Sequence, residues 1–372
     1  MPRKNRRIVA PDGVSVTLHC YTRCVRRAFL CGVDHETGVN YEHRKQWVRD
    51  RLEFLASVFA IDILGFAVMD NHFHIICRTR PDISDAWDDI EVARRWYRLF
   101  PKRRGPNGKI PEPTDAEIDE ILTLHSEGDT TKRAAELRRR LQNVSWLMKC
   151  VCEYISRKAN QEDQVTGTFW EGCFRAQKLL DDQAILACSV YVDLNPIRAA
   201  KVATPEESKF TSIYERIAAR QAKQGRSPSG RKLGKRQVEA VSSRRDRFLV
   251  PMTLPAKYEV DSSGKEDRSM VCQQQHRASN KGFLRMSLDK YLELLDWTGR
   301  QIRGDKRGSI PDSLAPILER LHISRETWVD CIQNFGRWFG WAVGKEKALV
   351  NQRDQSGQRR IRGRSQAAAV FG

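Results

Sequence analysis

The sequence predicts a mixed α+β protein, and three stretches near its N-terminus carry that prediction. Residues 14–22 alternate in polarity, as a strand with one buried face does. Residues 43–59 place apolar side chains at helical spacing. Residues 61–69 and 72–78 are apolar runs on either side of an Asp-Asn turn signal, which predicts an antiparallel hairpin. The predicted order at the start of the chain is therefore strand, helix, strand, strand.

The next part of the chain, about 80–160, reads as mostly helical. Its candidate helices cover 90–100, 115–125, 131–142 and 143–161, and a loop rich in Pro and Gly follows the first of them. Residues 167–180 are predicted to form another strand. The helix after it, 183–195, ends before Pro196, because a residue that precedes proline is pushed out of the helical region.

The C-terminal part of the chain divides by composition. Residues 206–285 read as a basic flexible linker, since positive charge is concentrated there together with Gly, Ser and Pro. Residues 286–345 are predicted to form a small helical accessory domain, with helices at 286–302, 311–321 and 324–343. Residues 346–372 are predicted to be a basic tail. The basic stretches could contact phosphate or could simply be solvated.

The charge balance points to a polyanionic partner. The 372 residues carry a formal net charge of +18, and the sequence pI is about 9.6. Nucleic acid is the first candidate for such a partner. No apolar stretch approaches the roughly 20 residues that a membrane span needs, and no secretory signal is visible, so we expect no membrane partner and a cytoplasmic location. The ten cysteines include no CxxC pair, which argues against a zinc ribbon.

The sharpest local feature is the pair His72 and His74 around Phe73. On a strand, residues i and i+2 point to the same face, so the two imidazoles share one side while Phe73 packs into the core on the other. Two adjacent imidazoles are half of a divalent-metal site. The alternative is a pair of histidines that are satisfied by ordinary packing.

The second feature is Tyr191 with Asn195, four residues further along the helix that ends at Pro196. A tyrosine offers a nucleophilic hydroxyl, and an Asn amide oxygen is a hard ligand suited to Mg or Mn. A core tyrosine and an ordinary helix stop would look the same. Together with the histidine pair and the positive charge, however, these residues could supply a nucleophile and a cation for phosphodiester chemistry.

Two segments of the sequence resemble motifs of a known family. VMDNHFHIICR is similar to the His-hydrophobe-His (HUH) motif of single-strand DNA transposases that use one tyrosine. GTFWEGCFRAQ followed by YVDLNPIRAAKV resembles the downstream signature of the REP-associated tyrosine transposase branch, the insertion-sequence-200-like transposase domain. The resemblance covers residues 8–205. It implies a ferredoxin-like antiparallel sheet with helices on one face, here with a long helical insertion.

The resemblance also implies roles for individual residues. His72 and His74 match the metal pair, Asn195 the polar group that completes the site for Mg or Mn, and Tyr191 the nucleophile. Arg175 and Lys178 are candidate DNA contacts, although an exposed basic strand would look the same. Asp193 and His19 are weaker candidates, the first because it falls on another helical face and the second because a packing role explains it equally well.

The implied function is that of a metal-dependent DNA transposase. Tyr191 would cleave single-stranded DNA that forms a hairpin, through a 5′-phosphotyrosine intermediate, and then rejoin it. The resemblance is compatible with a homodimer. Two alternatives stay open: a domesticated protein that binds DNA hairpins without cutting them, and a metal-dependent phosphodiesterase that uses water instead of tyrosine.

Overall fold

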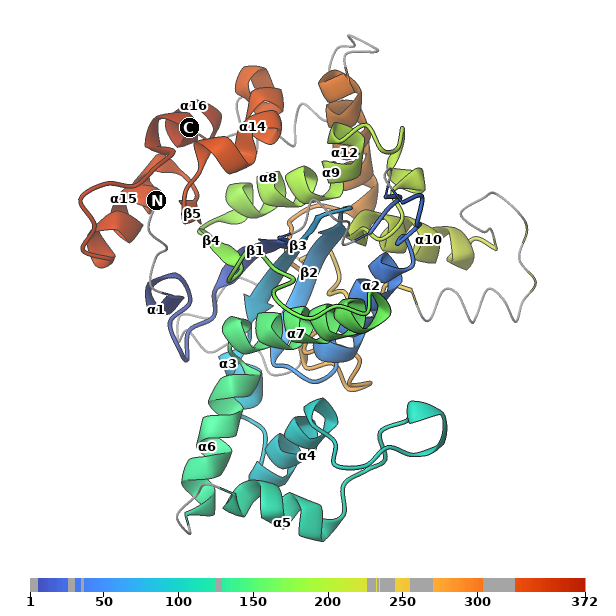
Figure 1. The fold of residues 1–372 in the computed structure, drawn as a ribbon. Helices are drawn as coiled ribbons and strands as arrows, with labels where there is room; N and C mark the ends of the chain where they lie inside the picture. The colour runs from blue at the N-terminus through green and yellow to red at the C-terminus, as the bar shows by residue number, and fades with distance from the viewer. Residues whose placement is uncertain are drawn as a thin grey trace.

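A five-stranded sheet forms the centre of the molecule (Figure 1). The computed structural model describes residues 6–25, 31–34, 37–124, 129–225, 232, 234, 245–254, 270–303 and 325–371. The strands are β1 (Thr17–Arg23), β2 (Ile61–Val68), β3 (His72–Thr79), β4 (Arg175–Leu179) and β5 (Ala342–Val343).

The strand order is β2-β3-β1-β4-β5. The first four strands are antiparallel to their neighbours, and β5 pairs in parallel with β4. Along the chain a helix lies between β1 and β2, β3 follows directly on β2, and helices separate β3 from β4. This is the β-α-β-β-α-β arrangement of a ferredoxin-like sheet, so the predicted α+β class is confirmed.

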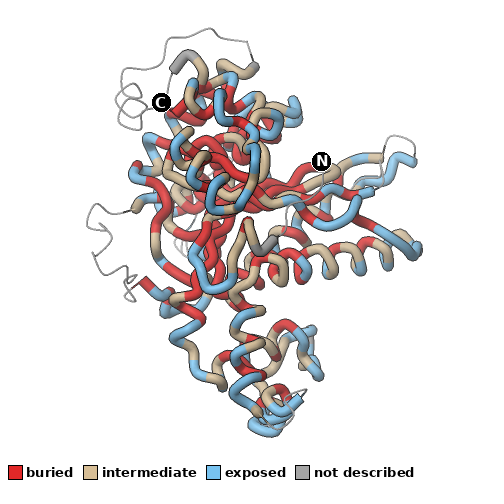
Figure 2. Tube along the Cα trace, turned by 90° about the vertical axis from the view of Figure 1, so that its left-hand side faces the viewer, coloured by how far each residue is buried: buried red, intermediate tan, exposed pale blue. Residues whose placement is uncertain are grey.

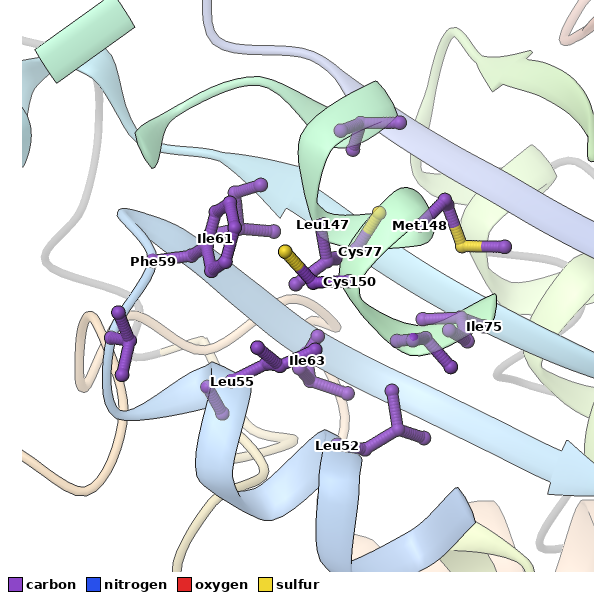
Figure 3. Close-up of a cluster of buried hydrophobic side chains, with 14 of the residues drawn as sticks. Leu52, Leu55, Phe59, Ile61, Ile63, Ile75, Cys77, Leu147, Met148 and Cys150 are labelled. Atoms are coloured by element: carbon purple, nitrogen blue, oxygen red, sulfur yellow. The ribbon is translucent and has the colours of Figure 1, made fainter. Parts of the chain in front are cut away.

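One face of the sheet is covered by α2 (Arg44–Ala56) and α7 (Val144–Glu162) (Figure 1). In Figure 3, Leu52 and Leu55 of α2 and Leu147 of α7 approach Ile63 and Ile75 of the sheet. All five side chains are fully buried. Each burial contributes roughly 1.5–3 kcal/mol, so this layer holds the two helices on the sheet.

The opposite face also carries helices, which the prediction of helices on one face did not include. This second layer contains α8 (Asp182–Asp193), α12 (Leu288–Arg303) and α14 (Arg325–Trp338), and its apolar residues form a separate core. Every residue of β2 is buried, as expected for a strand covered on both faces. The carboxylate of Asp181 caps α8 by accepting a hydrogen bond from the backbone nitrogen of Ala184 at 2.9 Å.

A bulge in β2 adjusts which residues face each layer. The register with β3 shifts between Ile63 and Gly65, so Ile63 and Phe66 both reach the core under α2 and α7. A Cβ atom on Gly65 would lie 3.0 Å from the Oγ atom of Ser212. Glycine therefore allows Ser212 to approach the bulged strand closely.

The predicted insertion between β3 and α7 is helical. It contains α4 (Asp89–Leu99), α5 (Asp115–Thr123) and α6 (Thr130–Leu141), which pack on one another. These helices extend below the sheet in Figure 1, and Figure 2 shows much exposed chain around them. They leave the sheet free to keep its ferredoxin-like order.

The segment predicted as a basic flexible linker, 206–285, contains ordered structure in its described parts. Residues 212–223 form α10 (Ser212–Lys223), and 248–250 are fully or almost fully buried beside β2. The prediction gave weight to charge, whereas the short apolar run at 248–250 determines the packing there. Much of the basic stretch, including 235–244, lies outside the described residues.

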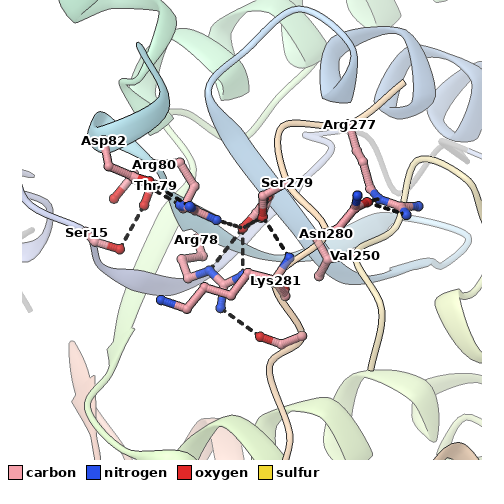
Figure 4. Close-up of polar contacts among 12 residues, drawn as sticks. Ser15, Arg78, Thr79, Arg80, Asp82, Val250, Arg277, Ser279, Asn280 and Lys281 are labelled. Carbon is pink, nitrogen blue, oxygen red and sulfur yellow. Dashed lines mark hydrogen bonds and ion pairs between the residues drawn. The ribbon is translucent and has the colours of Figure 1, made fainter. Parts of the chain in front are cut away.

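A buried ionic cluster attaches the far end of that segment to the sheet (Figure 4). The carboxylate of Asp62 accepts hydrogen bonds from the guanidinium of Arg78, at 2.7 and 3.0 Å, and from the hydroxyl of Ser279, at 2.8 Å. Arg80 lies 3.4 Å from the same carboxylate. Since Asp62 is completely buried, these partners compensate for its loss of water.

The C-terminal region is helical, but it shares a core with α8. The predicted helix at 324–343 ends at Trp338, and β5 then joins the sheet edge. The residues predicted as a basic tail form α15 (Glu346–Gln355) and α16 (Arg364–Phe371), whose Val370 and Phe371 are fully buried. Apolar positions at helical spacing within the tail explain this difference. The predicted helix at 311–321 lies outside the described residues.

The remaining described helices are short. They are α1 (Arg6–Val9), α3 (Pro81–Ser84), α9 (Asn195–Arg198) and the 3-10 turns Pro106–Gly108 and Pro205–Glu207. In the part of the chain that the structure describes, no helix has both the length and the apolar character needed to cross a bilayer.

Candidate functional site

The candidate site lies on the sheet face that α8 covers. The antiparallel register places Tyr21 opposite His74, and His19 opposite Gln177. Residues that are directly opposite each other in a sheet share a face, and so do residues i and i+2 of one strand. Three strands therefore bring His19, Tyr21, His72, His74 and Gln177 to one surface.

The two predicted metal ligands are neighbours on β3. The ring centroids of His72 and His74 are 5.0 Å apart, with the rings nearly perpendicular. Burial lowers the pKa of His72 from 6.5 to about 4, and the charge of Arg23 acts in the same direction. Burial lowers the pKa of His74 well below its usual value. Both imidazoles are therefore neutral at pH 7, which is the form that binds metals.

His19 takes part in the site as well as in packing. Its Nε2 atom lies 2.8 Å from Nδ1 of His74, and its Nδ1 atom lies 2.8 Å from Oε1 of Gln177. The Gln177 amide nitrogen donates in turn to the backbone carbonyls of Phe339, at 3.3 Å, and Gly340, at 2.7 Å. A continuous hydrogen-bonded row thus runs from the C-terminal region to His74.

Tyr191 approaches this row from α8. Its ring centroid is 5.8 Å from that of His74 and 6.0 Å from that of His19, both in edge-to-face contact. The guanidinium carbon of Arg198 lies 4.6 Å from the Tyr191 ring centroid. Burial raises the pKa of the Tyr191 phenol, while the charge and hydrogen bond of Arg198 oppose that rise. The phenol of Tyr191, the imidazoles of His19 and His74 and the guanidinium of Arg198 therefore lie close together.

Helix α14 covers the phenol from the other side. Phe335 stacks on Tyr191 with centroids 5.1 Å apart and an interplanar angle of 27°. A Cβ atom on Gly336 would lie 3.5 Å from the Tyr191 hydroxyl oxygen. The backbone carbonyl of Gln333 accepts a hydrogen bond from Arg198 at 3.0 Å. The described conformation is therefore one in which α14 limits access to the hydroxyl.

Asn195 is the first residue of α9, just beyond the end of α8. Its side chain is buried, and its Nδ2 atom has no hydrogen-bond partner among the described residues. Asp193 has a different role. Its buried carboxylate accepts hydrogen bonds from the hydroxyls of Ser212 and Tyr291, each at 2.7 Å. Asp193 therefore joins α8 to α10 and α12.

The two predicted DNA contacts lie on opposite faces of β4. Arg175 is exposed and pairs with Tyr21, so it shares the face of the candidate site. Lys178 is three residues later and points to the other face, where burial lowers its pKa. The structure brings only Arg175 to the side of Tyr191 and the histidines.

The donor set fits a divalent cation held by the histidine pair. Nε2 of His74 is buried and has no hydrogen-bond partner in the described part of the chain, so it is free to act as a ligand. Within those residues, no group of three or more His, Cys, Asp or Glu side chains is arranged to hold a metal. Asn195, water or substrate oxygen would have to complete the coordination. Two nitrogen ligands favour a transition metal such as Mn²⁺ over Mg²⁺, which prefers oxygen.

Three residues of the site were not identified from the sequence: Gln177, Arg198 and Phe335. The spacing of residues in the sequence could have identified Gln177 and Arg198. Gln177 is at i+2 from Arg175 on a predicted strand, and Arg198 is at i+7 from Tyr191, which is one helical face. Phe335 had no such signal, since its contact depends on how α14 packs.

Comparisons with known proteins add little to this geometry. No family model and no curated protein matches the sequence. A solved structure described as a REP-associated tyrosine transposase bound to a REP hairpin matches with a TM-score of 0.34 and 12% identity, over 59% of this chain and 86% of that chain. A likeness at this level does not determine the ligand or the chemistry of this chain.

Proposed function

We propose that this protein cleaves and rejoins single-stranded DNA with Tyr191 as the nucleophile. One observation carries the proposal: the Tyr191 ring lies 5.8 Å from that of His74, although the two residues are far apart in the sequence. The net charge of +18 supports a polyanionic substrate. The sequence resemblance to the HUH transposases agrees with both features.

In the proposed reaction, the Tyr191 oxygen loses its proton and attacks the phosphorus of a DNA phosphodiester. The bond from phosphorus to the 3′ oxygen breaks, and that oxygen takes up a proton to leave a 3′-hydroxyl. The 5′-phosphate stays esterified to Tyr191. Attack by the 3′-hydroxyl of another strand reverses these steps and releases the phenol. The free energy of the phosphodiester is kept in the ester, so no nucleotide cofactor is required.

The residues around Tyr191 have separate tasks in this scheme. Arg198 stabilises the phenolate through its charge and its hydrogen bond. His72 and His74 would hold a divalent cation, Mn²⁺ or Mg²⁺, with Asn195 as a further ligand. When bound, such a cation neutralises charge on the scissile phosphate. Arg175 is exposed on the same sheet face and would contact the DNA backbone.

A second function, hairpin binding without cleavage, is favoured by the packing of α14. Phe335 stacks on the Tyr191 ring, and Gly336 lies near its hydroxyl. A protein that keeps this conformation with DNA bound would not form a covalent bond. The proposed cleavage requires α14 to move away from the hydroxyl.

The experiment is a gel assay for a covalent adduct. The full-length protein is incubated with labelled single-stranded hairpin DNA in Mn²⁺, and products are separated under denaturing conditions. We expect a protein-linked 5′ product with the wild-type protein and none with Tyr191→Phe. Tyr154→Phe is the matched control, because Tyr154 is 38% exposed and lies on α7, which covers the other sheet face.

The other outcomes separate the alternatives. An adduct with Tyr191→Phe would show that another residue is the nucleophile. DNA binding without any cleavage would support the hairpin-binding protein. Cleavage that survives Tyr191→Phe without an adduct would support a phosphodiesterase that uses water.

A further inference from the structure

We propose that Gln177 and His19 are positioning residues that fix the proton of His74 on Nδ1 and so leave its Nε2 atom as a bare lone pair. We call the side chains of Gln177, His19 and His74 the relay. The relay exists without a cation or DNA. Its use in holding a cation rests on the proposed function.

The relay starts at two backbone carbonyls. The oxygens of Phe339 and Gly340 can only accept hydrogen bonds, so the group of Gln177 that faces them must be its NH₂. This contact fixes the orientation of the amide. The Oε1 atom of Gln177 therefore faces His19, and it too can only accept.

The orientation of Gln177 determines the tautomer of His19. Nδ1 of His19 lies 2.8 Å from Oε1 of Gln177 and must carry the hydrogen in that bond. His19 is 2% exposed, and its two ring nitrogens contact an amide oxygen and a second imidazole, with no carboxylate among the described residues to stabilise a charge, so the ring is neutral and holds one proton only. Nε2 of His19 is consequently unprotonated and acts as an acceptor.

The same reasoning then applies to His74. Its Nδ1 atom lies 2.8 Å from Nε2 of His19, and since that atom accepts, Nδ1 of His74 must donate. His74 is 3% exposed and also has no carboxylate partner among the described residues, so it is neutral and its Nε2 atom has no proton. This is the buried atom that has no hydrogen-bond partner in the described part of the chain. The relay therefore prepares a ligand atom that receives no hydrogen bond from the residues that the structure describes.

A hydrogen bond to the ring nitrogen that does not bind the metal commonly orients a metal-binding histidine and determines its tautomer. The hydrogen bonds of the relay begin in the C-terminal region, because the two carbonyls that orient Gln177 belong to residues 339 and 340, between α14 and β5. The region that covers Tyr191 is thus also the region that orients Gln177. Packing of the C-terminal residues and the state of His74 are linked through three side chains.

The direct test is long-range ¹H–¹⁵N correlation of the histidine side chains in the full-length protein at pH 7 with a chelator. Of the eight histidines, His19 and His74 are assigned through substitution. We expect both rings to be protonated on Nδ1 and bare on Nε2. Detection of the Nε2-protonated tautomer at His74 in the wild-type protein would overturn the proposal.

Two substitutions at position 19 test the cause. In His19→Gln an amide replaces the ring, and it can again donate to Gln177 and accept from His74, so we expect His74 to keep its tautomer. In His19→Leu the acceptor is lost. We expect His74 to populate the Nε2-protonated form and Mn²⁺ binding, measured by calorimetry, to weaken by about 10- to 100-fold.

Thermal unfolding and circular dichroism establish that each variant is folded. If His19→Leu does not fold, the wild-type tautomer and the comparison with His19→Gln still decide the question. An unchanged His74 tautomer in folded His19→Leu would contradict the relay. These spectra need neither DNA nor cleavage. The tautomer of His74 can therefore be determined even if the protein does not cleave DNA, and the two proposals can fail separately.

Discussion

The buried His19 makes the stability of the protein depend on pH in a defined way. The change is a shift from pH 7 to pH 5, applied to the wild-type protein and to His19→Gln in the presence of a chelator. We expect the wild-type protein to lose more free energy of unfolding than the variant. The reason is that the folded state holds His19 neutral while the unfolded chain protonates it.

The size of the expected loss in the free energy of unfolding follows from the pKa shift of His19. Burial lowers the pKa of His19 from 6.5 to about 4 in the folded protein, although its bond to Gln177 acts in the opposite direction. Between these two values the unfolded state binds more protons, so stability falls as the pH falls. From pH 6.5 to pH 5 the loss is roughly 1.5 units at about 1.4 kcal/mol each, or about 2 kcal/mol.

Urea unfolding monitored by tryptophan fluorescence measures this difference. The wild-type free energy of unfolding should fall by about 2 kcal/mol more than that of His19→Gln between the two pH values. Because both proteins contain the same carboxylates, their acid titration cancels in the comparison. Equal losses in the two proteins would show that His19 is not held neutral by burial, and the reasoning about its protonation would be refuted.

Three further predictions concern buried contacts elsewhere in the protein. Leu52→Ala should lower the free energy of unfolding by about 2–5 kcal/mol, measured by urea unfolding, because it opens a cavity under α2. Tyr291→Phe should cost about 1–3 kcal/mol, measured by thermal unfolding, since it removes a 2.7 Å hydrogen bond to the buried carboxylate of Asp193. Gly282→Ala should destabilise by about 1–3 kcal/mol or more, because the new Cβ atom would overlap the backbone carbonyl of Thr253, and limited proteolysis should then cut this segment faster.

The elements of the sheet could be predicted because their signals are local. The helix predicted at 43–59 is α2, and the apolar runs at 61–69 and 72–78 became β2 and β3. The strand predicted at 167–180 is shorter, with β4 limited to Arg175–Leu179. Periodicity identifies such elements, whereas their ends depend on pairing with neighbours.

The second helical layer could not be predicted in the same way. The unbroken apolar run of β2 is consistent with burial on both faces, but it does not specify which segment covers the second face. That cover comes from α8 and from C-terminal helices more than 200 residues away in the sequence. A long-range contact of this kind has no periodic signal.

The candidate site shows the same division. The period of a strand placed His72 and His74 on one face, and the structure has them there. That Tyr191 comes near them depends on which face α8 covers. The register of β4 places Gln177 on this face, but the orientation of its amide depends on the carbonyls of residues 339 and 340, which the sequence predicts to lie inside a helix.

The strands β4 and β2 have main-chain partners on the sides that face away from the centre of the sheet. Backbone nitrogens of Lys178 and Leu180 donate to the carbonyls of Trp341 and Val343, at 2.8 and 2.9 Å. On the other side, the carbonyl of Ile63 accepts from the nitrogen of Val250 at 3.0 Å. At these positions a second molecule cannot lengthen the sheet by adding a strand. A second molecule that lengthened the sheet would therefore have to pair with the two-residue strand β5 or displace these contacts.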